Sequence, residues 1–170
     1  MMRMVRNHRS AQLTAGTLLL TLLGFAGGTA YAGPFALGAN RTSNVTLTDP
    51  NNWQTILTIS ITSSPHGHAC QAVASLDALN PSNNATTQTY FFTISLDNAN
   101  PPLGASGIER SIELRNNPGV NDPNSWPVST NTVIGLTANS SHTLRLLGRR
   151  AFGAPNLAVD DAVLSIICVG

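Results

Sequence analysis

Clusters of turn-forming residues divide this chain into short segments, and their spacing constrains the fold more than any other feature. Asn, Asp, Pro and Gly concentrate in four places, which are Asp49–Asn52, Asn80–Asn84, Asp97–Pro102 and Asn116–Gly119. Proline fixes φ and removes a backbone donor, and asparagine tolerates left-handed geometry, so each cluster interrupts regular structure. No window between the clusters holds an apolar helical period over three turns. Strands, rather than helices, are therefore predicted between the clusters.

The segments between the clusters are rich in Ile, Val, Thr, Phe and Tyr, the residues that pleated strands prefer. In one of them, Ile112 and Leu114 alternate with polar residues, which is the period of a half-buried strand. The predicted strands are Gln54–Thr62, Ala69–Leu76, Thr89–Leu96, Arg110–Arg115, Thr132–Thr137, His142–Leu147 and Ala162–Val169, with a weaker run at Asn44–Thr48. We predict an all-β fold, an antiparallel β-sandwich, most simply a jelly roll of about eight strands.

The N-terminal segment has the three parts of a signal peptide, covering residues 1–32. Three arginines lie within the first nine residues, the apolar stretch Leu13–Ala26 follows, and Ala30–Ala32 offers small residues where a signal peptidase cuts. Cleavage before Gly33 leaves residues 33–170 as one secreted domain, since no repeat or linker divides them. The alternative is a retained membrane anchor, but a span needs about 20 apolar residues and this run is shorter. We expect a secreted or periplasmic protein without stable membrane insertion after cleavage.

The chain has two cysteines, Cys70 and Cys168, and both follow the predicted signal peptide. In an oxidising compartment an even number of cysteines predicts a disulfide, here a single Cys70–Cys168 bond. The bond requires the start of the strand at Ala69–Leu76 to lie beside the end of the last strand. The alternative is two buried free thiols that never meet.

The charged residues exclude several classes of function. All nine basic residues are arginines, and six of them remain after residue 32 to face eight acids. A faintly acidic domain without a basic run is not expected to bind nucleic acid. Without lysine there is no Schiff-base or P-loop chemistry, and no Gly-x-Ser-x-Gly nucleophile elbow occurs. We expect no cofactor.

The segment from His66 to Cys70 is the sharpest candidate for a metal site. Residues two apart on a strand project to the same side, and imidazole and thiolate are zinc or copper ligands. A metal site would use His66 and His68, with Cys70 as a third ligand if it were not in the disulfide. The alternative is two solvent-exposed histidines at the entrance of a strand.

Paired carboxylates offer little for catalysis. Asp160 and Asp161 are adjacent, so on a regular strand they point to opposite faces and form no catalytic dyad. A glycosidase needs two carboxyl groups about 5 to 10 Å apart in a cleft, and nothing in the sequence arranges the eight acids in that way.

The two tryptophans are the candidate binding residues. Trp53 lies in or beside a turn, and Trp126 lies in Asn116–Thr130, which is predicted to be the longest loop. Exposed tryptophans in loops stack on sugars or proteins by burying their apolar faces. The alternative for both is packing over the open end of the sandwich.

The C-terminal part resembles the end of the C1q/TNF-like jelly rolls of bacterial surface proteins. The residues that carry the resemblance are Val133–Ala138, Ser141–Leu146 and Leu157–Val169, together with the aromatic run Tyr90–Phe92. Members of that family are often trimers that bind partners and are not enzymes. The resemblance therefore implies a binding module and a homotrimer.

The function that fits these features is a secreted, non-catalytic binding or structural module with a glycan or protein ligand. One alternative is a fimbrial-type subunit, another secreted sandwich with one disulfide. The ending Cys168–Gly170 lacks the penultimate tyrosine that such subunits carry. The other alternative is a small secreted hydrolase with an unrecognised site.

Overall fold

The computed structural model describes residues 30–31, 33–79, 87–102, 109–114 and 125–169. The described residues form ten strands and no helix, as the all-β prediction requires. The strands are β1 (Ala30–Tyr31), β2 (Phe35–Arg41), β3 (Val45–Leu47), β4 (Gln54–Ser63), β5 (His68–Leu79), β6 (Gln88–Leu96), β7 (Arg110–Leu114), β8 (Ser125–Leu136), β9 (Ser141–Arg150) and β10 (Leu157–Val169).

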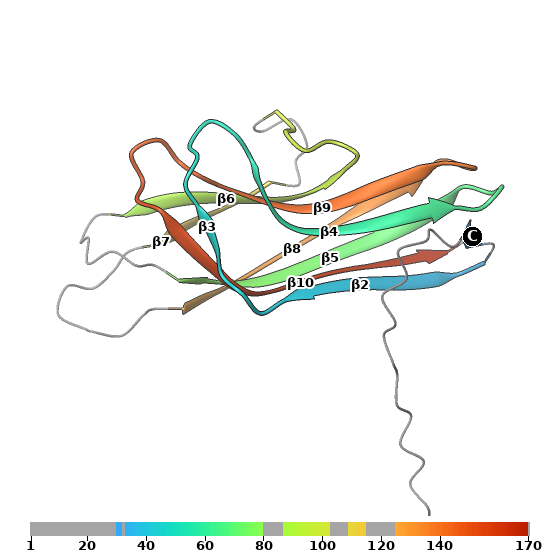
Figure 1. Cartoon of the computed structure of the whole chain (residues 1–170), viewed down its shortest axis with the longest axis horizontal. Helices are drawn as coiled ribbons and strands as arrows, with labels where there is room; N and C mark the ends of the chain where they lie inside the picture. The colour runs from blue at the N-terminus through green and yellow to red at the C-terminus, as the bar shows by residue number, and fades with distance from the viewer. Residues whose placement is uncertain (1–29, 32, 80–86, 103–108, 115–124, 170) are drawn as a thin grey trace, which may run out of the picture.

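The strands build two sheets that pack face to face (Figure 1). Sheet A has the order β1-β4-β9-β6-β7, and sheet B has the order β2-β10-β5-β8 with β3 also paired to β10. All pairings are antiparallel except that of β1 with β4. The chain changes sheet at almost every connection from β4 onward, which is the winding of a jelly roll. The predicted sandwich is therefore confirmed.

The core is made by the inward side of each strand. Tyr90, Phe92 and Ile94 alternate on β6 of sheet A, Leu164 and Ile166 alternate on β10 of sheet B, and all five belong to one core. These side chains are almost fully buried, and the outward neighbours on the same strands belong to the two outer faces. The alternation that predicted the strands thus also predicts which side of each strand is core.

Gly148 shows how closely the elements pack. A Cβ at this position would lie 2.8 Å from Leu47 Cδ1 and 2.9 Å from Ile56 Cδ1. Both leucine and isoleucine are buried core residues, so there is no room for the extra carbon without displacing them. Glycine at position 148 therefore lets the side chains of Leu47 on β3 and Ile56 on β4 pack directly against the backbone of β9.

The structure corrects the predicted strands in two places. The predicted loop Asn116–Thr130 is wrong over Ser125–Thr130, because β8 already begins at Ser125; the earlier part of that loop lies outside the described residues. Pro127 fits because β8 is the edge strand of sheet B, where a missing donor is tolerated. The strand β2 at Phe35–Arg41 was not predicted, because Ala36, Gly38 and Asn40 occupy its outward positions and have low strand propensity.

The predicted signal peptide falls largely outside the described residues, and it stays a prediction. Ala30–Tyr31 pairs with Thr62–Ser63 at the edge of sheet A, so of the described strands, cleavage before Gly33 would remove β1 alone. Within the described ranges, no helix is long and apolar enough to cross a membrane.

Candidate functional site

The outer side of sheet B is the most unusual surface of the described chain. Its side chains form four cross-strand rows, which we call the open face. The rows are Val169, Ala69 and Gly135; Ala36, Ile167, Gln71 and Val133; Gly38, Ser165, Val73 and Asn131; and Asn40, Val163, Ser75 and Ser129. None of these residues carries a charge.

Large aliphatic side chains are exposed on the open face. Val133 is 78% exposed and Ile167 62%, and Val169, Val73 and Val163 are also exposed. Folded monomers rarely leave such a cluster of branched aliphatic side chains in water, since each costs hydrophobic free energy. Gln71 and several serine, asparagine, glycine and alanine residues fill the other positions, so the open face is uncharged.

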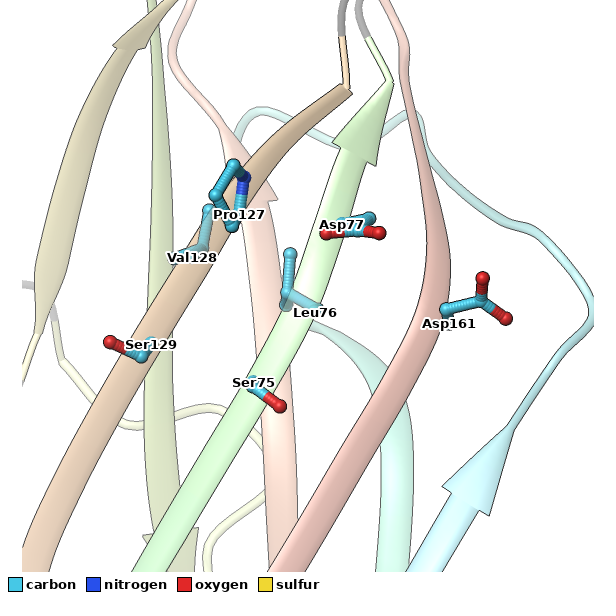
Figure 2. Close-up of a pocket in the computed structure, with 7 residues that line it drawn as sticks. All are labelled: Ser75, Leu76, Asp77, Pro127, Val128, Ser129 and Asp161. Carbon is cyan, nitrogen blue, oxygen red and sulfur yellow. The ribbon is translucent and has the colours of Figure 1, made fainter.

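A hollow lies at one end of the open face (Figure 2). It is lined by residues of β5, β8 and β10, which are Ser75, Leu76, Asp77, Pro127, Val128, Ser129 and Asp161. Two carboxylates and two hydroxyls thus border a proline ring on rigid strands. This set can accept hydrogen bonds from a hydroxyl-rich ligand.

The position of Asp161 corrects the expectation that the two adjacent aspartates point to opposite faces. The register of β10 against β5 shifts between Asp160 and Val163, and Asp161 has a φ of 45°. Val159 and Ala162 on either side are both buried, so the bulge leaves both aspartates on the outer side. Asp160 lies directly opposite Asp77, and the acids gather at this end of sheet B.

The disulfide lies under the open face. Cys70 and Cys168 are direct partners in the β5–β10 register, and their sulfur atoms are bonded. Both residues point inward and are buried. The predicted Cys70–Cys168 bond is confirmed, and it joins the two central strands of sheet B.

The two histidines predicted to hold a metal differ in their burial. His66 is exposed in the turn before β5, whereas His68 is buried with its ring edge against Phe35, at 5.2 Å between centroids. His68 Nε2 lies 3.3 Å from Ser64 Oγ. Cys70 is in the disulfide and is not a ligand. Among the described residues, no group of three or more His, Cys, Asp or Glu is placed to hold a metal ion.

Trp53 is a packing residue on the outer side of sheet A. It is 7% exposed, its Nε1 donates to Pro101 O at 2.7 Å, and its backbone N donates to Asn100 Oδ1. The Arg149 guanidinium lies 5.8 Å from the Trp53 ring centroid and 5.7 Å from that of Phe91. Trp53 thus packs against protein, as the alternative supposed, but on the outer side of sheet A and not over the open end of the sandwich; little of its ring is exposed.

Trp126 is in a strand and not in a loop. It pairs with Ala78 and shares the inward side of β8 with buried Val128, but at the end of the sheet it is 43% exposed. Its ring is thus accessible at the end of the sandwich, on the opposite side of β8 from the open face.

A polar network that was not predicted joins three strand ends. Asp97 follows β6, and its Oδ2 lies 2.7 Å from Nδ1 of buried His142 on β9. The Thr137 hydroxyl lies 3.1 Å from His142 Nε2, and Thr143 N donates to Asp97 Oδ1 at 2.6 Å. An aspartate after one strand and a lone histidine 45 residues later carry no sequence signal that pairs them.

Asp97 is held in its ionised form by this network. Burial works to raise the pKa of Asp97, but hydrogen bonds from His142 and Thr143 and the charges of His142 and Arg145 keep it below the ordinary value of 3.8. Because an ionised carboxylate only accepts hydrogen bonds, His142 Nδ1 donates to Asp97, and His142 Nε2 lies within hydrogen-bonding distance of the Thr137 hydroxyl. The order of carboxylate, imidazole and hydroxyl is also that of nucleophilic relays.

Comparison with known proteins gives no family. No protein-family model matches the chain, and no curated protein matches it. Among solved structures, the chain is similar to the C-terminal domain of EclA, a sugar-binding protein, with a TM-score of 0.38 and 13% identity over 73% of this chain and 78% of that one. It is also similar to a tryptic core variant of Cry1Da from Bacillus thuringiensis, with a TM-score of 0.25 and 12% identity over 83% of this chain and 21% of that one. Neither similarity carries a functional assignment.

Proposed function

We propose that this protein is an exported, non-catalytic binding module that works by contact through its open face. The observation that carries the proposal is the cluster of exposed aliphatic side chains on an uncharged sheet surface. Exposed apolar patches of this kind mark interaction sites in soluble proteins. Strands backed by a disulfide and a packed core give the surface a fixed shape, so that little is lost in ordering it on binding.

Export is supported by two independent features. The Cys70–Cys168 bond is of the kind that persists in oxidising compartments. The first 32 residues have the arginines, the apolar run and the small-residue site of a signal peptide. The resemblance of the C-terminal part to C1q/TNF-like domains supports the other part of the proposal, that the protein acts by binding and not by catalysis.

A pull-down with the immobilised protein tests the proposal with two probes, a detergent extract of the envelopes of the producing cells and the wild-type chain in solution. The immobilised wild type is expected to retain at least one of the two probes, and the double variant Val133→Asp, Ile167→Asp neither, because it places charges in the middle of the open face. Phe152→Asp is the matched control, since Phe152 is 89% exposed in the β9–β10 connection. Equal retention by the double variant and the wild type, or none by the wild type, would overturn the proposal. Trp126→Ala in the same assay tests the separate prediction that Trp126 contacts a ligand.

A second candidate function, hydrolysis, has one observation in its favour. The carboxylate of Asp97, the ring of His142 and the hydroxyl of Thr137 lie in the order of a relay. Its test is the hydrolysis of p-nitrophenyl acetate by the wild type and by Thr137→Val. A rate above that of buffer that falls in the variant would support hydrolysis. We expect equal rates, because the ring is 7% exposed and serves to join strand ends.

A further inference from the structure

We infer that the partner of the open face is a second copy of this chain, stacked face to face about a two-fold axis. The inference rests on the proposed function and names the partner for the same surface. It is argued from the charge, the chemistry and the area of the open face.

The absence of charge makes the open face compatible with itself. Its four rows contain no Asp, Glu, Lys or Arg, so an identical face brings no like charges into the interface. The acids Asp77, Asp160 and Asp161 all lie beyond one end of these rows. A two-fold axis across the strands, through the row of Ser165, Val73 and Asn131, separates the acids of the two copies. It places the acidic end of each over the Val169, Ala69 and Gly135 row of the other.

The side chains of the open face favour protein over the other surfaces that an exported protein meets. The four rows have no aromatic ring to stack on a sugar and no basic side chain to attract an anionic membrane. They offer branched aliphatic side chains that stand beside glycine, alanine and serine, which is the pattern by which two β-sheets interdigitate. A second open face presents the same ridges and spaces.

The area fits a weak, transient dimer. The four rows span seven residues on each strand, and four strands about 4.8 Å apart at about 3.3 Å per residue give roughly 440 Å² on each copy. The pair covers about 900 Å², which is below the roughly 1,200 Å² of stable specific interfaces and in the range of transient ones. Because the area is this small, we expect weak association, with a Kd of about 10 to 500 μM.

The concentration dependence of the mass tests the inference directly. Sedimentation equilibrium of the mature chain from 1 to 500 μM is expected to show a monomer–dimer equilibrium. The double variant Val133→Asp, Ile167→Asp should raise the Kd of the dimer at least 100-fold, while Phe152→Asp should leave this Kd unchanged. Circular dichroism spectra confirm that all three proteins are folded. A chain that is monomeric throughout, a trimer, or a double variant that dimerises like the wild type would overturn the inference.

A cross-linking experiment tests the position of the axis. Val73 lies in the row on the axis, so Val73→Cys is expected to be cross-linked between two copies by a short bis-maleimide, because sheets packed face to face lie about 10 Å apart, too far for a direct disulfide. Phe152→Cys, which is also exposed but lies off the open face, is the control and should form no such dimer at the same concentration. Equal cross-linking of the two variants would overturn the proposed stacking. A monomeric wild type that still retains envelope components in the pull-down, when Val133→Asp with Ile167→Asp does not, would leave the proposed function standing and overturn only the dimer.

Discussion

The outer faces of the two sheets differ in what covers them. On sheet A, Thr93 and Leu147 occupy outward positions by the alternation of β6 and β9, yet they are 1% and 0% exposed. On sheet B, the corresponding outward residues Val133 and Ile167 are exposed. The difference teaches that alternation assigns the side of a strand, whereas a covering segment decides whether that side meets water.

The cover of sheet A is built from segments distant in the sequence. The chain after β6 turns back over sheet A, as Figure 1 shows, and Pro101 O accepts the hydrogen bond from Trp53 Nε1. Arg149 lies between the rings of Trp53 and Phe91. At the other end of this segment, Asp97 is tied to β9 by its backbone N, which donates to Thr143 O at 2.8 Å, and by its carboxylate. The outer side of sheet A is therefore covered by the protein itself, whereas the outer side of sheet B, which no described segment covers, is available to a partner.

Removing the ring that anchors the cover should have the largest effect. Trp53→Ala deletes a buried ring, its hydrogen bond to Pro101 O and one of the two aromatic contacts of Arg149. We expect a loss of about 3–5 kcal/mol in the free energy of unfolding, which urea denaturation measures. Trp126→Ala is the control, because that ring is 43% exposed, and it should lose less. Equal losses would mean that Trp53 does not secure a cover.

Breaking the disulfide should have the next largest effect, and it acts on sheet B, whose outer side no described segment covers. The Cys70–Cys168 bond closes a loop of 98 residues. Cys70→Ala with Cys168→Ala is expected to lower the free energy of unfolding by about 2–4 kcal/mol. The measurement is urea denaturation beside the oxidised wild type. A variant as stable as the wild type would show that the hydrogen bonds of β5 and β10 suffice to hold the open face.

Acid should weaken the tie between Asp97 and β9. The pKa of Asp97 is lowered in the folded state, so its contribution is present above the unfolded pKa and is lost as the pH falls through the folded value. We expect the stability to decline below about pH 4, and the decline to be shallower in Asp97→Asn. Asp49, whose pKa is lowered by hydrogen bonds from Asn52 and Asn51, adds to the same decline and remains in the variant. Identical pH profiles of the melting temperature would exclude a role for Asp97.

Truncation on the open face should have the smallest effect on folding. Val133→Ala removes two methyl groups from a side chain that is 78% exposed, so we expect a change within about 0.5 kcal/mol for the monomer. Leu147→Ala, an outward residue that is fully buried on sheet A, is the matched comparison and should lose about 2–5 kcal/mol. Thermal denaturation of dilute protein measures both changes in stability. Equal losses would remove the distinction between a covered and an open face.

Much of the fold could be predicted because strand period and turn chemistry are local. Ile112 and Leu114 on β7 and Tyr90, Phe92 and Ile94 on β6 alternate in the sequence as they do in the structure. The strands that were missed or shortened have weak local signals: Gly and Asn in β2, Pro127 in β8, and the aspartates of the β10 bulge. Local chemistry therefore predicts an element where the residues agree on one conformation and misses it where tertiary pairing outweighs propensity.

The sequence by itself determined the sandwich, the inward side of most strands and the pairing of its two cysteines. Only the tertiary structure decided that Trp53 is covered, that Asp97 meets His142, and that Val133 and Ile167 belong to one open face. The physical reason is the range of the interactions. Alternation acts between residues two apart, whereas burial of an outer face depends on segments that the strand order brings together from 40 or more residues away.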